Sequence, residues 1–194
     1  MRMRRRQIIA GCGALWGQTL LMADAEAFAF GPPSTLEEMA RRVESEFRQV
    51  THLPTGELAA RDQGASALHL FDVRERDEFD VSHLNGAERI APNISTASAL
   101  GQIGPRAEDA VVVFYCSVGQ RSSRLAARTQ SELEALGARA VYNLRGGVFA
   151  WHNESRPLVD RWGPTPYVHP FSERWRRLLT NPQLSAFRVR TAAQ

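Results

Sequence analysis

Hydrophobic residues form short unbroken runs, and stretches with helical spacing separate these runs. The clearest run covers residues 111–115, which are β-forming residues without a polar break. Such a run is typical of a strand that is buried on both faces of a parallel sheet. Residues 67–73 and 138–144 also predict strands, and residues 88–91 predict a shorter one.

Helical spacing follows the central run directly. Leu125, Thr129, Leu133 and Leu136 recur about one turn apart until Gly137 ends the pattern. The chain therefore predicts a buried strand, a short loop beginning at Cys116, and a helix behind that loop.

An apolar stripe also runs from Leu36 to Val50 and predicts a helix of about four turns. Ser34 and Glu37 have the spacing of a capping box at its start, just after a linker at residues 32–33. We expect this helix to cover an edge of the sheet. Shorter helices are predicted at residues 56–61 with Thr55 as the cap, at 94–103, from about 148, and at 172–179.

Strands that alternate with helices indicate an α/β fold with a parallel sheet. At 194 residues the chain has room for one domain of ordinary size and extensions. We expect four parts: a targeting segment at residues 1–29, an N-terminal helix at 30–50, the α/β domain at 51–158 and a C-terminal extension at 159–194.

The C-terminal extension contains prolines and one predicted helix. We expect it to dock Trp162, Phe171 and Trp175 onto the sheet domain. An arm that binds a partner or a membrane surface is the alternative.

The loop after the central strand carries the candidate chemistry. In open α/β sheets, ligands bind beyond the carboxyl ends of the strands. Backbone N–H groups curling around a small turn form an anion site, and Gly119 lets the chain approach closely. The partial positive charges of these N–H groups, together with the charge of Arg121, favour the thiolate form of Cys116. The alternative is a small buried cysteine without a chemical role.

The spacing within the loop separates two chemistries. Cysteine phosphatases place an arginine six positions after the cysteine, where it forks onto phosphate oxygens. Here Arg121 stands five positions after Cys116, and Ser122 takes the sixth position. The loop is one residue short for phosphate, although it is large enough for a sulfur centre.

This loop resembles that of the single-domain rhodaneses, or thiosulfate sulfurtransferases. Residues 70–74, 78–79 and 83–87 are similar to the N-terminal signature of that family, and residues 144–151 to its C-terminal signature. The resemblance covers about residues 50–158 and implies a rhodanese-like sheet of about five parallel strands with helices on both faces.

The resemblance also implies a chemistry without a cofactor or a metal. A small anionic sulfur donor would give its sulfur to Cys116, which then carries a persulfide. A thiol, cyanide or a protein acceptor would take that sulfur from Cys116. The loop would hold the anion through Ser117, Val118, Gly119, Gln120, Arg121 and Ser122.

Three further side chains near this edge have expected roles. Asp72 and Arg74 tie loops together around the site without touching sulfur. Residues 75–80 are expected to form a solvated helical turn. His83 is expected to pack beneath a turn closed by Gly86, and a role as general base is the alternative.

Two other functions stay open at this point. A rhodanese-like module can carry sulfur for a partner or serve only in binding, with free thiosulfate as a poor donor. A cysteine phosphatase is the third possibility, which the loop length opposes.

The N-terminal 29 residues have the composition of a targeting segment. Four arginines precede an apolar stretch of about sixteen residues, and Ala27, Phe28 and Ala29 offer a cleavage site. The Arg5–Arg6 pair resembles a twin-arginine export signal. We expect export to the periplasm, and membrane contact only through an uncleaved N-terminus or the extension.

Charge and cysteine content add little to this picture. All 24 basic residues are arginine, and the formal net charge of +3 implies no nucleic-acid surface. Removal of the segment would also remove Cys12 and leave Cys116 as the one cysteine, which could form no internal disulfide.

Overall fold

The structure is a computed structural model that describes residues 33–61 and 67–189. The predicted targeting segment lies outside the described residues. In the part of the chain that is described, no helix is long and apolar enough to cross a membrane.

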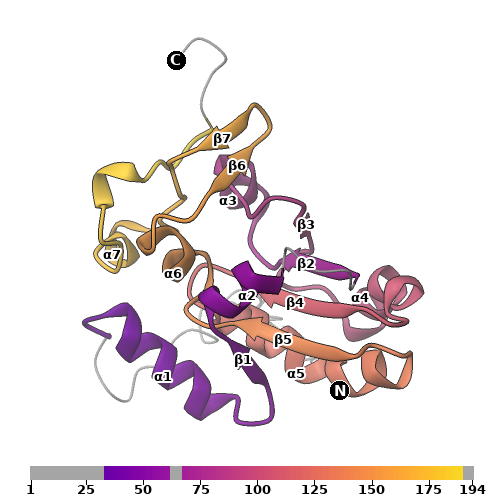
Figure 1. Ribbon diagram of the computed structural model, residues 1–194. Helices are drawn as coiled ribbons and strands as arrows, with labels where there is room; N and C mark the ends of the chain where they lie inside the picture. The colour runs from indigo at the N-terminus through magenta and orange to yellow at the C-terminus, as the bar shows by residue number, and fades with distance from the viewer. Residues whose placement is uncertain (1–32, 62–66, 190–194) are drawn as a thin grey trace, which may run out of the picture. The chain divides into compact units, whose positions relative to one another are not determined.

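Five parallel strands form the central sheet, which confirms the predicted fold class (Figure 1). The order of the strands across the sheet is β1-β5-β4-β2-β3. Every residue of β4 is buried, because strands flank it on both edges and helices cover its faces. The bounds are Thr51–Leu53 for β1, Leu68–Asp72 for β2, Glu88–Arg89 for β3, Val111–Tyr115 for β4 and Ala140–Leu144 for β5.

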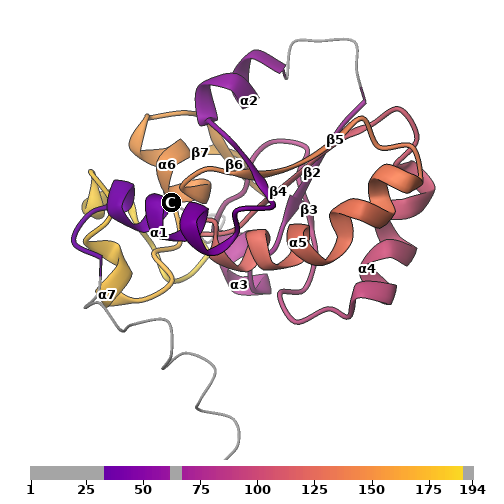
Figure 2. The same ribbon diagram turned by 90° about the horizontal axis from the view of Figure 1, so that it is seen from below.

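Helices lie on both sides of this sheet. Figure 2 shows α2 on one side, with α4 and α5 together on the other. The helices are α1 (Leu36–Glu46), α2 (Thr55–Arg61), α3 (Arg76–Val81), α4 (Thr96–Ile103), α5 (Gln120–Ala135), α6 (Gly147–Asn153) and α7 (Glu173–Arg176), with 3₁₀ turns at Gly104–Arg106 and Pro182–Leu184.

Helix α5 buries Leu125, Thr129 and Leu133 against the sheet, as its spacing predicts. Leu136, the last residue of the pattern, is 50% exposed. Leu136 is the C-cap, and the helix ends there because Gly137 adopts a left-handed φ of 95°.

The predicted capping box at the start of α1 is wrong by one residue. Thr35 is the N-cap, and its hydroxyl accepts a hydrogen bond from the backbone N–H of Glu38 at 3.1 Å. The Glu38 carboxylate accepts in turn from the backbone N–H of Ser34 at 2.8 Å. This arrangement leaves Glu37 for Arg145, which donates two hydrogen bonds of 2.8 Å to its carboxylate.

The C-terminal extension begins with a hairpin of β6 (Leu158–Asp160) and β7 (Gly163–Thr165). Val159 exchanges two backbone hydrogen bonds with His83, at 2.8 and 2.9 Å, which fixes the hairpin to the loop after α3.

The extension docks mainly through Val168, Leu178 and Leu179, which are buried in the core. Trp175 packs against that core, as expected, but Trp162 and Phe171 are 54% and 47% exposed. Phe171 still reaches the sheet domain, because its ring centroid lies 5.1 Å from Arg121 Cζ of α5, whereas the exposed Trp162 stacks on the neighbouring Arg161. The predicted helix at 172–179 is only the short α7.

Replacing Phe114 by alanine should lower the free energy of unfolding by about 3–5 kcal/mol, because Phe114 is fully buried in the central strand. The same truncation at the half-exposed Leu136 is the control and should cost less than about 1 kcal/mol. Chemical denaturation of both variants measures the difference, and equal losses would contradict the described core.

Candidate active site

Cys116 follows β4 directly, and residues 116–119 form the loop that opens α5. The cysteine is 1% exposed. Its Sγ accepts a hydrogen bond from the backbone N–H of Gly119 at 3.2 Å. Gly119 adopts a left-handed φ of 99°, and this turn directs its N–H back toward the sulfur.

The thiol is buried, yet its pKa lies below the ordinary value. Burial by itself would raise the pKa of Cys116. The positive charge of Arg121 and hydrogen bonds from the backbone N–H groups of Ser122 and Val118 outweigh that effect and lower the pKa. The loop therefore favours the thiolate.

Arg121 is held by a buried carboxylate. Its Nη1 and Nη2 donate to the two carboxylate oxygens of Glu78 at 2.8 and 2.9 Å. Nη2 also donates to Ser117 Oγ at 3.0 Å, and that hydroxyl donates to Glu78 at 2.9 Å. The guanidinium is thus fixed between α3 and the loop, with 23% of the side chain exposed.

Glu78 is the main residue of this site that our reading of the sequence missed. It lies in α3, in the predicted solvated turn, but is only 2% exposed. The prediction for this residue is wrong because Arg121 compensates its charge. Although burial opposes ionisation, the Arg121 bond and charge and the charge of Arg74 lower the pKa of Glu78 to about 2. Glu78 belongs to residues 78–79, which are similar to the N-terminal signature of the family, and this position was the signal in the sequence that could have indicated a role at the site.

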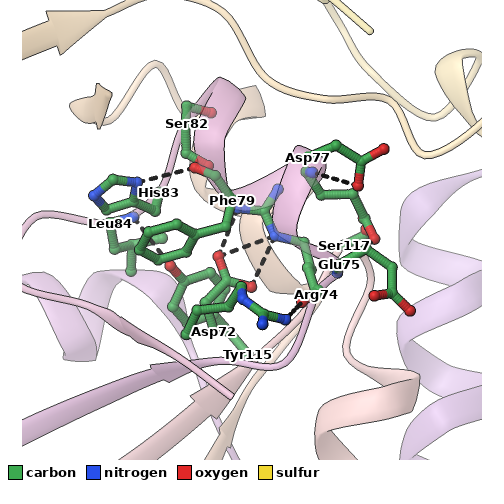
Figure 3. Close-up of polar contacts among 12 residues, drawn as sticks. Asp72, Arg74, Glu75, Asp77, Phe79, Ser82, His83, Leu84, Tyr115 and Ser117 are labelled. Atoms are coloured by element: carbon green, nitrogen blue, oxygen red, sulfur yellow. Dashed lines mark hydrogen bonds and ion pairs between the residues drawn. The ribbon is translucent and has the colours of Figure 1, made fainter. Parts of the chain in front are cut away.

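Asp72 and Arg74 form a second buried ion pair behind the loop (Figure 3). Arg74 donates to both Asp72 oxygens, with the shortest distance 2.6 Å, and to the Ser82 carbonyl at 2.6 Å. The charge of Asp72 raises the already high pKa of Arg74, although burial opposes this shift. Tyr115 Oη accepts from the Leu84 N–H at 3.1 Å, so the loop after α3 is tied to the ends of β2 and β4.

His83 packs on helix α3. Its ring stacks on Phe79 with centroids 3.9 Å apart, and its Nδ1 lies 3.0 Å from the Phe79 carbonyl oxygen. Figure 3 shows the imidazole beside Leu84, on the Tyr115 side of the buried pair.

The carbonyl groups of the loop are bound by the start of α6. The N–H groups of Val148 and Phe149 donate to the Cys116 and Ser117 carbonyls at 2.8 and 3.0 Å. Gly147 makes this approach possible, since a Cβ there would lie 2.3 Å from the Cys116 carbonyl oxygen. With the carbonyls bound on that side, the loop N–H groups are left to face the sulfur.

The remaining loop side chains have different surroundings. Ser122 Oγ donates to Asn143 of β5 at 2.6 Å, a partner that the sequence did not suggest. Val118 joins the hydrophobic core. Gln120 donates to the Glu46 carboxylate at 3.2 Å, so its side chain points away from the sulfur. Among the described residues, no group of three or more His, Cys, Asp or Glu residues could hold a metal ion.

Residues 55–154, just over half of the chain, match the family described as Rhodanese-like domain. The chain belongs to the rhodanese-like domain family. The family resemblance predicted from the cysteine loop is therefore confirmed.

Known relatives match parts of this rhodanese-like protein. Over 91 residues it is 31% identical to the probable adenylyltransferase/sulfurtransferase MoeZ of Mycobacterium tuberculosis, a match that covers 46% of this chain and 21% of MoeZ. Over 92 residues it is 36% identical to the uncharacterized protein YqhL of Bacillus subtilis, covering 45% of this chain and 64% of YqhL. The chain thus spans a fifth of MoeZ and less than two thirds of YqhL.

The fold is similar to that of a thiosulfate sulfurtransferase from Pseudomonas aeruginosa. The TM-score is 0.51 at 21% sequence identity, and the match covers 77% of this chain and 27% of the other. This similarity shows the shared fold.

Replacing Gly147 by alanine should destabilise the protein by more than about 3 kcal/mol, because the new Cβ would collide with the Cys116 carbonyl at a φ of 60°. Gly86→Ala is the matched control, since Gly86 has a φ of 75° and no atom within 4 Å of the added Cβ. It carries the backbone strain alone, about 1–2 kcal/mol. Equal losses in denaturation experiments would show that α6 does not press on the loop.

Glu78→Gln should remove a pH-dependent part of the stability. The folded pKa of about 2 lies below the ordinary 4.5, so Glu78 stabilises the fold above pH 4.5. That contribution, about 3 kcal/mol, is lost as the pH falls through 2. The wild type and the variant should therefore differ at pH 7 and converge in acid.

Asp80→Asn is the control for this experiment, because the ion pair of Asp80 with Arg76 in the same helix is exposed. Its stability difference should stay below about 1 kcal/mol at every pH. A Glu78→Gln difference that is small at pH 7 or constant with pH would contradict the buried ion pair.

Proposed function

We propose that this protein is a sulfurtransferase that moves sulfane sulfur from a donor such as thiosulfate to a thiol or cyanide acceptor. The carrying observation is the buried Cys116 sulfur, whose pKa is lowered although burial opposes this shift. A thiolate among N–H donors is a nucleophile placed where a small anion can be held. The family membership and the name of MoeZ support this proposal.

The proposed first step forms a persulfide. The Cys116 thiolate attacks the outer sulfur of thiosulfate, and a new S–S bond forms. The S–S bond of thiosulfate breaks, and its electron pair leaves with sulfite. The terminal sulfur of the Cys116 persulfide carries the negative charge, and no proton has to move.

The second step returns the enzyme to its first state. A thiolate or cyanide attacks the outer sulfur, the persulfide bond breaks, and its electrons return to Cys116. The loop N–H groups stabilise the anionic sulfur in both states, and Arg121 supplies a fixed positive charge. Because Arg121 forks onto Glu78, we assign most of the direct hydrogen bonding to the backbone N–H groups.

The place of action is part of the proposal. We propose that residues 1–29 direct export to the periplasm, because a basic start, an apolar stretch and a small-residue cleavage site follow one another. Among the described residues Cys116 is the one cysteine, so it can form no disulfide within this part of the chain, and in an oxidising compartment its free thiol is explained by a chemical role.

Cys116→Ser should fold normally and lose sulfur transfer by roughly a thousandfold or more, because no thiolate remains to accept sulfur. The measurements are thiocyanate formation from thiosulfate and cyanide, and intact mass after incubation with the donor. The wild type should gain the mass of one sulfur atom, and the variant should gain none.

Cys12→Ser in the full chain is the control, because it changes the other cysteine of the sequence. This variant should still form thiocyanate and should still gain the mass of one sulfur atom. Normal transfer by Cys116→Ser would overturn the mechanism. A wild type that takes up sulfur but turns over thiosulfate far below about 1 s⁻¹ would favour a sulfur carrier over an enzyme for that donor.

A further inference from the structure

The C-terminal extension places an aromatic ring against the arginine of the active loop. The ring of Phe171 lies 5.1 Å from Arg121 Cζ, measured to the ring centroid. Phe171 lies beyond residues 55–154, the part that matches the family. The extension therefore contacts the group that supplies the positive charge for Cys116.

The backbone at Phe171 holds this ring under strain. Its φ is 63°, a left-handed conformation that is uncommon for a bulky residue. The Phe171 N–H donates to Nδ1 of the buried His169 at 3.0 Å, and the Ser172 N–H donates to the Pro170 carbonyl at 2.7 Å. The Trp175 ring lies edge-on to the Phe171 ring, with the two centroids 6.4 Å apart. A turn that is held in a strained backbone conformation is consistent with a role in positioning the Phe171 ring.

Packing in the hydrophobic core does not explain the position of the Phe171 ring. It is 47% exposed, so it contributes much less to the core than the buried Val168, Leu178 and Leu179 of the same extension. A cation over an aromatic face is attracted to the ring and partly shielded from water. Shielding Arg121 lowers the local dielectric, so its charge acts more strongly on the thiolate.

We infer that Phe171 is a positioning residue of the active site, through which the C-terminal extension holds Arg121 and increases the reactivity of Cys116. This inference rests on the proposed function. The chain would then need its extension for full sulfur transfer, although the cysteine loop lies in the family domain.

The other titratable and charged groups around Arg121 are the same residues in the wild type and in the Phe171 variants. Glu78 and Arg74 interact with Arg121 from the sheet edge. His169 interacts with these three groups and with Asp77 of α3. Burial lowers the pKa of His169, so this imidazole titrates below its usual range. The same groups are present in the wild type and in each Phe171 variant, so a difference between them reports the ring.

The test compares Phe171→Leu, which keeps an apolar side chain, with Phe171→Tyr, which keeps the aromatic face. The rate of alkylation of Cys116 is measured against pH in the full chain, from the mass of the peptide that contains it. Phe171→Leu should raise the midpoint by about half a pH unit, and Phe171→Tyr should restore the wild-type value. Sulfur transfer near neutral pH should fall about threefold in the leucine variant.

Trp162→Leu is the matched control, because Trp162 is also exposed and lies over an arginine, Arg161, but in the hairpin turn. It should leave the midpoint unchanged, and thermal denaturation checks that each variant is folded. An unchanged midpoint in Phe171→Leu, or an equal shift in Phe171→Tyr or Trp162→Leu, would overturn the inference. These midpoints are read without any sulfur donor, so failure of the inference and failure of the proposed function are distinguishable.

Discussion

The structure of the site depends on how its loop favours the thiolate form of a buried cysteine, Cys116. A buried anion is costly unless fixed dipoles and an opposite charge replace the water that it loses. Here the turn at Gly119 supplies an N–H group at 3.2 Å, and Arg121 supplies the charge. Arg121 is largely buried itself, so it needs Glu78 as its own partner. The positive charge that lowers the pKa of Cys116 therefore requires a carboxylate that is buried in a different helix.

A second layer of buried charge fixes the frame around this cluster. Asp72 and Arg74 are completely buried, and Arg74 reaches the Ser82 carbonyl from the end of β2. Separating the two residues would leave uncompensated charges inside the protein, at a large cost in free energy. Arrangements of these loops that separate Asp72 from Arg74 are therefore disfavoured. The ends of β2 and β4 are thereby held together at the edge where α3 carries Glu78 toward Arg121.

The glycines of this site serve close packing. Gly119 turns its N–H toward the sulfur, and Gly147 lets α6 bind the carbonyls on the other side of the loop. The carbonyls of Cys116 and Ser117 are thus directed toward α6, while the N–H group of Gly119 is directed toward the thiol. Backbone N–H groups that converge in this way form a cradle for an anion.

Local patterns in the sequence determined the secondary structure and the chemistry of the loop. The run at residues 111–115, the helical spacing after it and the loop that begins at Cys116 depend on near neighbours, and the structure places them as predicted. The sequence did not reveal the burial of Glu78, the bond from Ser122 to Asn143 or the contact of Phe171 with Arg121. These partners come from different elements, and only the strand order and the path of the extension bring them together. For the same reason a charged residue in a short helix looked solvated, because burial of a charge depends on a partner that local spacing does not identify.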